Sequence, residues 1–233
     1  MCSATIEAMS SRTVADGLWK MLSSAGVTRC YGVVGDALNP VMDAMRRHGG
    51  VEFVHVRNEE YGVLAAVAQA RLTGRPVVVC GTAGPGVVHL MNGLLDARRE
   101  RVPIIVLAGD TETALVDTET MEELTPYQFF ASAAVYIGRL VNPRQLRPVV
   151  TSAVAAALTQ GGPAVIAVPG DVAASHHDED HVGHPVSRPL RPAAADADLD
   201  QMAEIIKMRE RSRSSAITAA PTHKAKSADW RSW

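Results

Sequence analysis

The chain has 233 residues, a formal net charge of −2 at pH 7 and a hydrophobic share of 47%. This length accommodates one large domain or one domain and a fragment, and the apolar share is sufficient for a core. The sequence contains no basic stripe, no zinc-finger spacing and no run of 18 apolar residues, so we expect neither nucleic-acid binding nor a membrane span. The first residues lack a signal-peptide pattern, which favours a cytoplasmic protein.

The three cysteines, Cys2, Cys30 and Cys80, are odd in number and far apart. This spacing argues against a disulfide framework and against a metal cluster. Cys30 and Cys80 fall in apolar runs, where a free cysteine behaves as a small hydrophobic residue. We therefore expect both to be buried in strands.

Apolar runs alternate with helix-like segments along most of the chain. Strands are predicted over residues 29–34, 51–56, 76–80, 103–108, 135–140 and 164–168. Helices are predicted over residues 13–25, 38–47, 87–99, 125–131 and 144–158, with a further one after Asn58. Six strands separated by helices predict an α/β fold with a doubly wound, mainly parallel sheet and helices on both faces.

The segment from Val54 to Gly74 runs from a short strand directly into a helix. Asn58 is the expected N-cap, which places Glu59 and Glu60 in the first turn, where the helix dipole favours negative charge. A well-started helix explains this pattern without any function. The position of this helix in the predicted sheet suggests a ligand-binding role for Glu59. A strand that leads directly into a helix puts Glu59 at the carboxyl edge of the sheet, where open α/β proteins bind ligands.

Three turns connect predicted elements near that edge. Gly35-Asp36 ends the first strand, and Asp36 is expected to cap the next helix. The loop Gly81–Gly86 is neither G-x-G-x-x-G nor a P-loop, and its three glycines bring bare backbone close to either a packed helix or a flat ligand ring. The acid-rich segment 109–124 is predicted to be an exposed loop that folds over a site.

The composition changes after residue 174. His176, His177, His181 and His184 are metal-ligand residue types, but their Pro-rich surroundings favour a solvated linker, and no metal site is predicted. We therefore expect a flexible N-terminus at residues 1–11, a domain at 12–174, a linker at 175–195, and a last segment at 196–233. The basic, serine-rich residues from 207 onward are expected to be disordered.

Four motifs occur in the order and spacing of one family: G-V-V-G-D-A-L-N-P at Gly32–Pro40, V-R-N-E-E at Val56–Glu60, G-T-A-G-P-G-V-V-H-L-M-N-G-L-L-D-A at Gly81–Ala97, and A-V-P-G-D-V at Ala167–Val172. They resemble the N-terminal pyrimidine-binding domain of thiamine-diphosphate enzymes of the pyruvate oxidase and acetolactate synthase type. The resemblance covers about residues 12–174 and is closest to the quinone-linked pyruvate oxidases.

The resemblance implies that Glu59 hydrogen-bonds the pyrimidine ring nitrogen and so promotes formation of the thiazolium ylid. Gly35 and the turn Gly84-Pro85-Gly86 would form the wall beside the pyrimidine. Asn92 would help to set that turn, and Asp36 and Glu122 complete the expected cofactor-binding residues. The chain departs from the family at Asn58, where relatives have His, and at Met121-Glu122-Glu123, where they have F-Q-E.

Relatives continue through a middle domain, which holds much of the FAD in the oxidases, and a third domain that grips the diphosphate through magnesium. Residues 196–206 resemble the first helix of the middle domain, and the pattern is lost from Lys207 onward, so a frameshift or premature stop after Ile206 is our hypothesis. FAD and magnesium are then expected only with the missing domains.

Three readings of function follow. The chain is the pyrimidine-binding part of an oxidoreductase or lyase acting on pyruvate-like 2-oxo acids, completed by a homo-oligomer or by a separate chain that carries the diphosphate-binding domain. Alternatively, it is an inactive truncated product or interaction module that keeps the dimer-forming surface. An unrelated dinucleotide-binding protein is disfavoured because both phosphate-binding signatures fail.

Overall fold

The computed structural model describes residues 12–177 and 195–219. Residues 12–177 contain a six-stranded, all-parallel sheet with the strand order β2-β1-β3-β4-β6-β5, which confirms the predicted α/β fold. The strands are β1 (Arg29–Gly32), β2 (Glu52–His55), β3 (Val77–Gly81), β4 (Ile104–Asp110), β5 (Tyr136–Arg139) and β6 (Pro163–Pro169).

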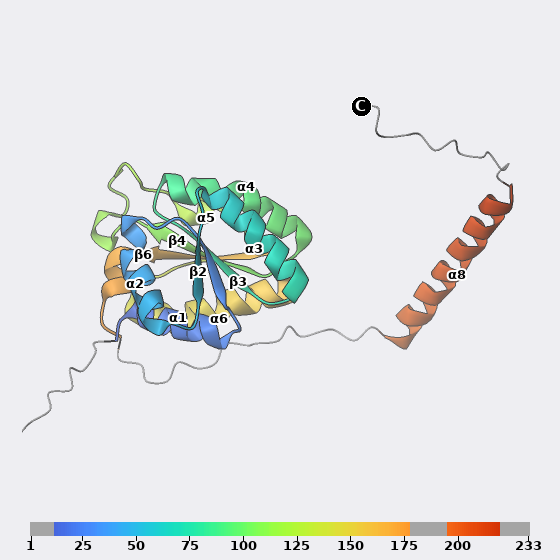
Figure 1. The fold of residues 1–233 in the computed structure, drawn as a ribbon, viewed down its shortest axis with the longest axis horizontal. Coiled ribbons are helices and arrows are strands. Elements are labelled where there is room, and N and C mark those ends of the chain that lie inside the picture. Colours follow the sequence, from blue (N-terminus) through green and yellow to red (C-terminus); the bar gives the residue numbers. More distant parts are fainter. Residues whose placement is uncertain (1–11, 178–194, 220–233) are drawn as a thin grey trace, which may run out of the picture. The chain divides into compact units, whose positions relative to one another are not determined.

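Helices cover both faces of the sheet, as Figure 1 shows. One layer consists of α1 (Val14–Ser24), α2 (Asn39–His48), α6 (Leu146–Ala156) and α7 (Gly170–Ala174). The other consists of α3 (Glu59–Thr73), α4 (Pro85–Glu100) and α5 (Pro126–Phe129). Side chains of β3 alternate between the two layers, with Val77 and Val79 in one core and Val78 and Cys80 in the other. Both faces of this strand are therefore buried, as its all-apolar sequence predicted.

Short turns account for most differences from the predicted element boundaries. A 3-10 turn (Asp36–Leu38) precedes α2, so Asp36 does not cap that helix; its Oδ1 accepts instead from the Ala37 N–H, at 2.8 Å. Helix α4 begins at Pro85, two residues earlier than predicted, because proline is well tolerated in the first helical turn. Further 3-10 turns lie at Thr113–Leu115 and Pro143–Gln145, and α6 ends in a π-helical segment at Ala157–Gly161.

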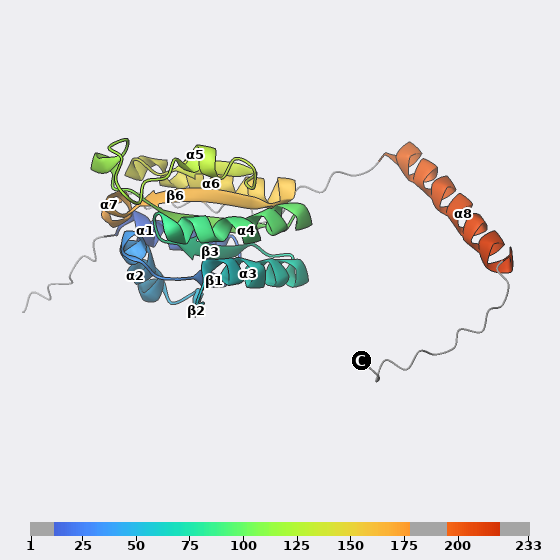
Figure 2. The ribbon, with the colours of Figure 1, turned by 90° about the horizontal axis from the view of Figure 1, so that it is seen from above.

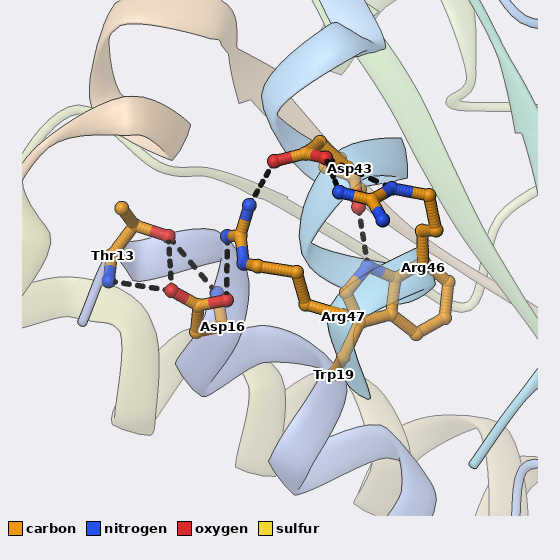
Figure 3. Close-up of polar contacts among 7 residues, drawn as sticks. Thr13, Asp16, Trp19, Asp43, Arg46 and Arg47 are labelled. Carbon is orange, nitrogen blue, oxygen red and sulfur yellow. Dashed lines mark hydrogen bonds and ion pairs between the residues drawn. The ribbon is translucent and has the colours of Figure 1, made fainter. Parts of the chain in front are cut away.

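A polar network joins the start of α1 to α2 (Figure 3). The Thr13 N–H donates to Asp16 Oδ2 at 2.9 Å, and the Asp16 N–H donates back to Thr13 Oγ1 at 3.2 Å, which forms a capping box. Arg47 of α2 donates to Asp16 Oδ1 at 2.7 Å. Below it, the buried Trp19 indole donates to the Val41 carbonyl at 2.7 Å. These contacts fix α1 against α2 through one ion pair and one buried hydrogen bond.

Cys30 and Cys80 are fully buried on the neighbouring strands β1 and β3, as predicted. Their Sγ atoms lie 3.7 Å apart, without a disulfide. Burial, together with the neighbouring thiol of Cys80, raises the pKa of Cys30 well above its usual range. The two thiols therefore act as small core side chains. Cys2 lies outside the described residues.

The folded unit extends past the predicted domain end at residue 174. Thr13 forms an antiparallel bridge with His176, and the His177 N–H donates to the Arg12 carbonyl at 2.9 Å. His177 itself is buried. Residues 175–177 thus belong to the domain and not to the predicted linker, while His181 and His184 lie outside the described residues.

Residues 196–219 form a second unit, the helix α8 (Asp196–Ala219). The helix continues past Lys207, where the sequence showed no helical pattern. Its side chains from Asp196 to Arg209 are exposed, so local helix propensity and not packing supports it. The disorder predicted from residue 207 onward is therefore wrong for residues 207–219, and residues 220–233 lie outside the described residues. Among the described helices, none is long and apolar enough to cross a membrane.

Candidate functional site

The junction of β2 and α3 carries the main candidate residue, Glu59. Asn58 has an extended backbone, and its Oδ1 accepts from the Glu60 N–H at 2.9 Å, which confirms the predicted N-cap. Glu59 is the first residue of α3 and is only 6% exposed. A buried carboxylate at this position benefits from the positive end of the helix dipole.

One oxygen of Glu59 has a side-chain partner. Glu59 Oε2 lies 3.0 Å from Nδ1 of His89, whose side chain is 49% exposed. His89 lies on α4, which runs beside α3 (Figure 2). This close approach depends on Gly93, because a Cβ there would lie 2.6 Å from Cβ of Val63. The sequence analysis missed His89 as a site residue, although it lies within the G-P-G-V-V-H motif.

The other oxygen of Glu59 lies against the bare backbone of Gly86. A Cβ on Gly86 would lie 3.2 Å from Glu59 Oε1 and 3.0 Å from Cγ2 of Thr82. Any larger residue would crowd the carboxylate. The absence of a side chain at Gly86 therefore lets this backbone and the carboxylate approach each other closely.

The glycine turn between β3 and α4 contacts the turn after β1. Gly84 has φ 67°, a left-handed conformation that glycine adopts without strain. Gly35 lies against the Thr82 side chain, and the Thr82 hydroxyl donates to Asp36 Oδ1 at 3.4 Å. Of the two open alternatives for this loop, close helix packing applies to Gly81, whose Cβ would lie 2.5 Å from the Gly86 carbonyl oxygen.

Asn92 lies further along α4 than the glycine turn. Its Nδ2 donates to Glu60 Oε1 at 2.6 Å, so Asn92 ties α4 to the first turn of α3. Asn92 was predicted to support the glycine turn. In the structure its side chain contacts Glu60 of α3. Because the Glu60 carboxylate is bonded to Asn92, we do not assign Glu60 a role beside Glu59.

A cavity of about 600 Å³ lies at the carboxyl ends of β1, β3, β4 and β6. Asp36 and Glu122 both line it, whereas Glu59 does not. Glu122 also packs on the glycine turn, since a Cβ on Gly84 would lie 3.2 Å from Glu122 Cβ. Carboxylates dominate the polar lining: Asp36, Asp110, Glu112, Glu122 and Asp171. The predicted residues thus form two neighbouring groups, one around Glu59 and one around this acidic cavity, with the glycine turn between them.

The loop after β4 forms one wall of the cavity, as expected for a segment that folds over a site. It begins after Asp110, because β4 ends two residues later than predicted. The Asp171 carboxylate accepts from the Thr113 N–H and hydroxyl, which pins the loop to α7. Glu123 accepts from the backbone N–H groups of Asp117 and Glu119, at 2.5 and 3.1 Å. These bonds hold the loop in a defined shape.

A buried ion pair lies beside the same cavity and was not predicted. Arg139 of β5 donates to both Asp110 oxygens, at 2.6 and 3.0 Å. Burial raises the pKa of Asp110, although Arg139 acts in the opposite direction. The two residues are 29 positions apart, so no local pattern in the sequence reveals this pair. Within residues 12–177 and 195–219, no group of three His, Cys, Asp or Glu residues could hold a metal ion.

Comparison with known proteins identifies the family. Residues 12–132 match the family described as "Thiamine pyrophosphate enzyme, N-terminal TPP binding domain". The chain is 38% identical to the pyruvate oxidase of Lactiplantibacillus plantarum over 66% of this chain and 26% of that protein. It is 33% identical to the acetolactate synthase of Bacillus subtilis over 76% of this chain and 31% of that protein.

A further relative is a 42.6 kDa protein encoded in the isoamylase 3′ region of Pseudomonas amyloderamosa, with 39% identity over 85% of this chain and 50% of that protein. The chain therefore spans half or less of the length of these relatives. The family match covers the sheet edge, Glu59, His89 and the glycine turn. The chain belongs to the thiamine-diphosphate enzyme family, and its residues 12–132 match the N-terminal cofactor-binding domain of that family.

Proposed function

We propose that this domain holds the pyrimidine end of thiamine diphosphate and that Glu59 is the hydrogen-bond partner of the pyrimidine ring nitrogen. The observation that carries the proposal is the state of the Glu59 carboxylate. It is buried at the carboxyl edge of the sheet, one oxygen contacts His89, and the other lies beside the bare backbone of Gly86.

When bound, the cofactor would supply a thiazolium ring that acts as the electron sink for the negative charge formed when a 2-oxo acid loses carbon dioxide. In this proposal Glu59 holds and returns a proton at the pyrimidine nitrogen, which is general acid–base work for a carboxyl group shielded from water. His89 orients the carboxylate through its contact with Oε2. Gly35, Gly84, Pro85 and Gly86 form the wall beside the ring.

The diphosphate end belongs to another domain in this proposal. The cavity next to the glycine turn is lined by five carboxylates, of which Asp110 is paired with Arg139, and the other four would repel a diphosphate. A magnesium-bearing domain from a second copy or a separate chain would therefore hold the diphosphate, and FAD would come with such additional domains. The names of the relatives support a pyruvate-like 2-oxo acid as substrate.

By its resemblance to the family, Glu122 occupies a position where relatives carry an amide. The location of Glu122 limits how strongly the added carboxylate affects Glu59. It lines the acidic cavity with Asp36 and packs on Gly84, whereas the described partner of Glu59 is His89. We infer that the extra carboxylate weakens binding of anionic substrates at the cavity and leaves proton transfer at Glu59 possible.

Hydrogen–deuterium exchange at the thiazolium C2 tests the role of Glu59. The chain is mixed with thiamine diphosphate, magnesium and a chain that supplies the diphosphate-binding domain. Glu59→Gln keeps the shape of the side chain but cannot exchange the proton, so the C2 exchange rate should fall by about 10²–10⁴-fold. Glu60→Gln is the matched control and should keep the wild-type rate. Unchanged exchange in Glu59→Gln would remove Glu59 from this role.

A second candidate function is an interaction module without catalysis. The observation that favours it is a set of exposed apolar side chains on α3 and α4: Tyr61, Leu64, Val88 and Leu95. Such side chains on adjoining helices are typical of a surface that packs against another domain. Sedimentation velocity of the chain should show self-association that Leu64→Glu and Leu95→Glu abolish, whereas Glu59→Gln leaves it unchanged. A monomer at all concentrations would exclude this candidate.

A further inference from the structure

A second pocket lies at the opposite edge of the sheet from Glu59. It has a volume of about 490 Å³ and is lined by Arg98, Arg99, Arg101, Gln160 and Gly161. Arg101 precedes β4 and Gly161 precedes β6, so the pocket is at the amino ends of these strands. The seven residues of β4 separate it from the carboxyl edge by about 20 Å. It is therefore distinct from the site around Glu59.

The pocket concentrates positive charge. None of its lining residues is acidic. The neighbouring acid, Glu100, pairs at 2.5 Å with Arg71 of α3. Within residues 12–177 and 195–219, the structure gives Arg98, Arg99 and Arg101 no ion-pair partner. The negative end of the α4 dipole accounts for arginines in its last turn, but it does not account for the third arginine beyond the helix end.

Arg101 has an unfavourable backbone conformation. It follows α4 with φ 54° and ψ 38°, the left-handed region that glycine usually occupies at this position of a helix end. A non-glycine residue there is strained relative to glycine. The chain thus retains an arginine at a position where glycine would be more stable. Strain of this kind is an indication of function when a site surrounds it.

A glycine makes room for Arg101. Gly161 has φ 68°, and a Cβ there would lie 2.6 Å from the Arg101 carbonyl oxygen. The next residue, Gly162, has φ 142°, and a Cβ there would lie 2.8 Å from Cγ1 of Val135. The π-helical end of α6 can therefore approach the end of α4 closely. Both segments therefore build the pocket, and its arginines and Gln160 are exposed to solvent.

We propose that this pocket binds a small phosphate-bearing anion. Guanidinium groups present paired N–H donors that match two phosphate oxygens, and the Gln160 amide adds a neutral donor. The volume suits a phosphorylated molecule up to the size of a nucleotide. The phosphate group is the recognised chemistry, and it can come from free phosphate or from a nucleotide. This inference does not depend on the proposed role of Glu59.

Calorimetric titration of the full chain in a phosphate-free, low-salt buffer tests the proposal. Inorganic phosphate and ADP should each bind saturably, with an affinity that falls as sodium chloride is added. Adenosine, which lacks phosphate, should not bind. Tighter binding of ADP than of phosphate would identify a nucleotide as the source, and similar affinities would identify free phosphate. No saturable binding of either, or binding of adenosine as tight as that of ADP, would overturn the proposal.

Variants locate the binding. Arg98→Gln and Arg99→Gln should each weaken phosphate binding about tenfold, which corresponds to the loss of one charge-assisted hydrogen bond. The matched controls Arg144→Gln and Arg147→Gln change exposed arginines outside the pocket and should leave the affinity unchanged. Equal weakening by the controls would mean that only the overall charge attracts the anion, and would contradict a defined site.

The variant Arg101→Gly distinguishes a role of Arg101 in phosphate binding from a role in the stability of the fold. Glycine relieves the left-handed strain, so this variant should raise the midpoint of thermal unfolding while weakening phosphate binding about tenfold. A structural role for Arg101 predicts the reverse, a lower midpoint with unchanged binding, and that result would overturn the proposal.

Discussion

The starts of α1 and α3 look alike in sequence and differ in what their acids contact. Each helix has a polar N-cap, Thr13 or Asn58, whose side chain accepts a backbone hydrogen bond, and each has an acid in its first turn. Asp16 accepts hydrogen bonds from the Thr13 N–H, the Thr13 hydroxyl and Arg47 (Figure 3). Glu59 is more deeply buried, yet its described side-chain partner is His89 alone.

This difference in hydrogen-bond partners indicates that Asp16 stabilises the fold, whereas Glu59 is available to bind a ligand. A buried carboxylate with a single side-chain partner is less well stabilised by the protein than one with several, so its retention needs another reason. For Asp16 that reason is the link between α1 and α2. For Glu59 we propose that it is the pyrimidine ring.

The largest expected effect concerns cofactor affinity. If Glu59 provides only the pyrimidine contact, the isolated chain lacks the charge-assisted bonds that hold the diphosphate. Three such bonds at about 1.5–3 kcal/mol each amount to roughly 5–9 kcal/mol, which would weaken a micromolar site to beyond millimolar. Titration calorimetry with thiamine diphosphate and magnesium should therefore show no saturable binding by this chain alone. Micromolar binding would mean that the chain itself holds the diphosphate.

A smaller effect is expected from the N-caps. Thr13→Ala removes the capping box and should destabilise the domain by about 1–2 kcal/mol, because the first turn of α1 then loses a hydrogen bond in each direction. Asn58→Ala removes one capping bond and should cost about 1 kcal/mol. Urea unfolding measures both. A larger cost at Asn58 would argue that the start of α3 is the more structural of the two.

The smallest effect is the response to acid. Burial opposes ionisation of Asp16, but hydrogen bonds from Thr13 and Arg47 outweigh it and lower its pKa. A lowered folded-state pKa contributes stability above the unfolded value, about 3.9, and this contribution is lost as the pH falls through the folded pKa. The pH dependence of the Asp110 contribution to stability has the opposite sign. Burial raises the pKa of Asp110, so its contribution to stability is lost as the pH rises.

Unfolding measurements between pH 2 and 5 should therefore show a weaker dependence on pH in Asp16→Asn than in the wild-type chain. Asp43→Asn, at an exposed partner of Arg47, is the control and should keep most of the wild-type dependence. An unchanged slope in Asp16→Asn would show that its contacts do not stabilise the charged form.

The sequence was sufficient for features that depend on local patterns. The all-apolar run at β3, the Asn58 cap and the burial of Cys30 and Cys80 follow from periodicity and residue type. The 3-10 turn at Asp36 was not predictable, because a capping acid and a 3-10 turn share the same residues.

Contacts between residues far apart in the chain could not be predicted from the sequence, for a different reason. The pairs Glu59–His89 and Asp110–Arg139 form only because strands and helices pack in one particular order. The resemblance to the family supplied Glu59, whereas His89 required the packing of α3 on α4. The strained Arg101 likewise depends on how closely the end of α6 approaches it.

Comparison of Asp16→Asn with Glu59→Gln in urea unfolding tests the central distinction most directly. Both substitutions are nearly isosteric and remove one negative charge. Asp16→Asn should lose about 1–2 kcal/mol, because it weakens the capping box and the Arg47 contact. Glu59→Gln should change the free energy of unfolding by less than about 0.5 kcal/mol, since relief of the buried charge offsets the lost contact with His89 and the helix dipole. If Glu59→Gln instead cost as much as Asp16→Asn or more, Glu59 would be a structural acid and the proposed cofactor contact would lose its physical basis.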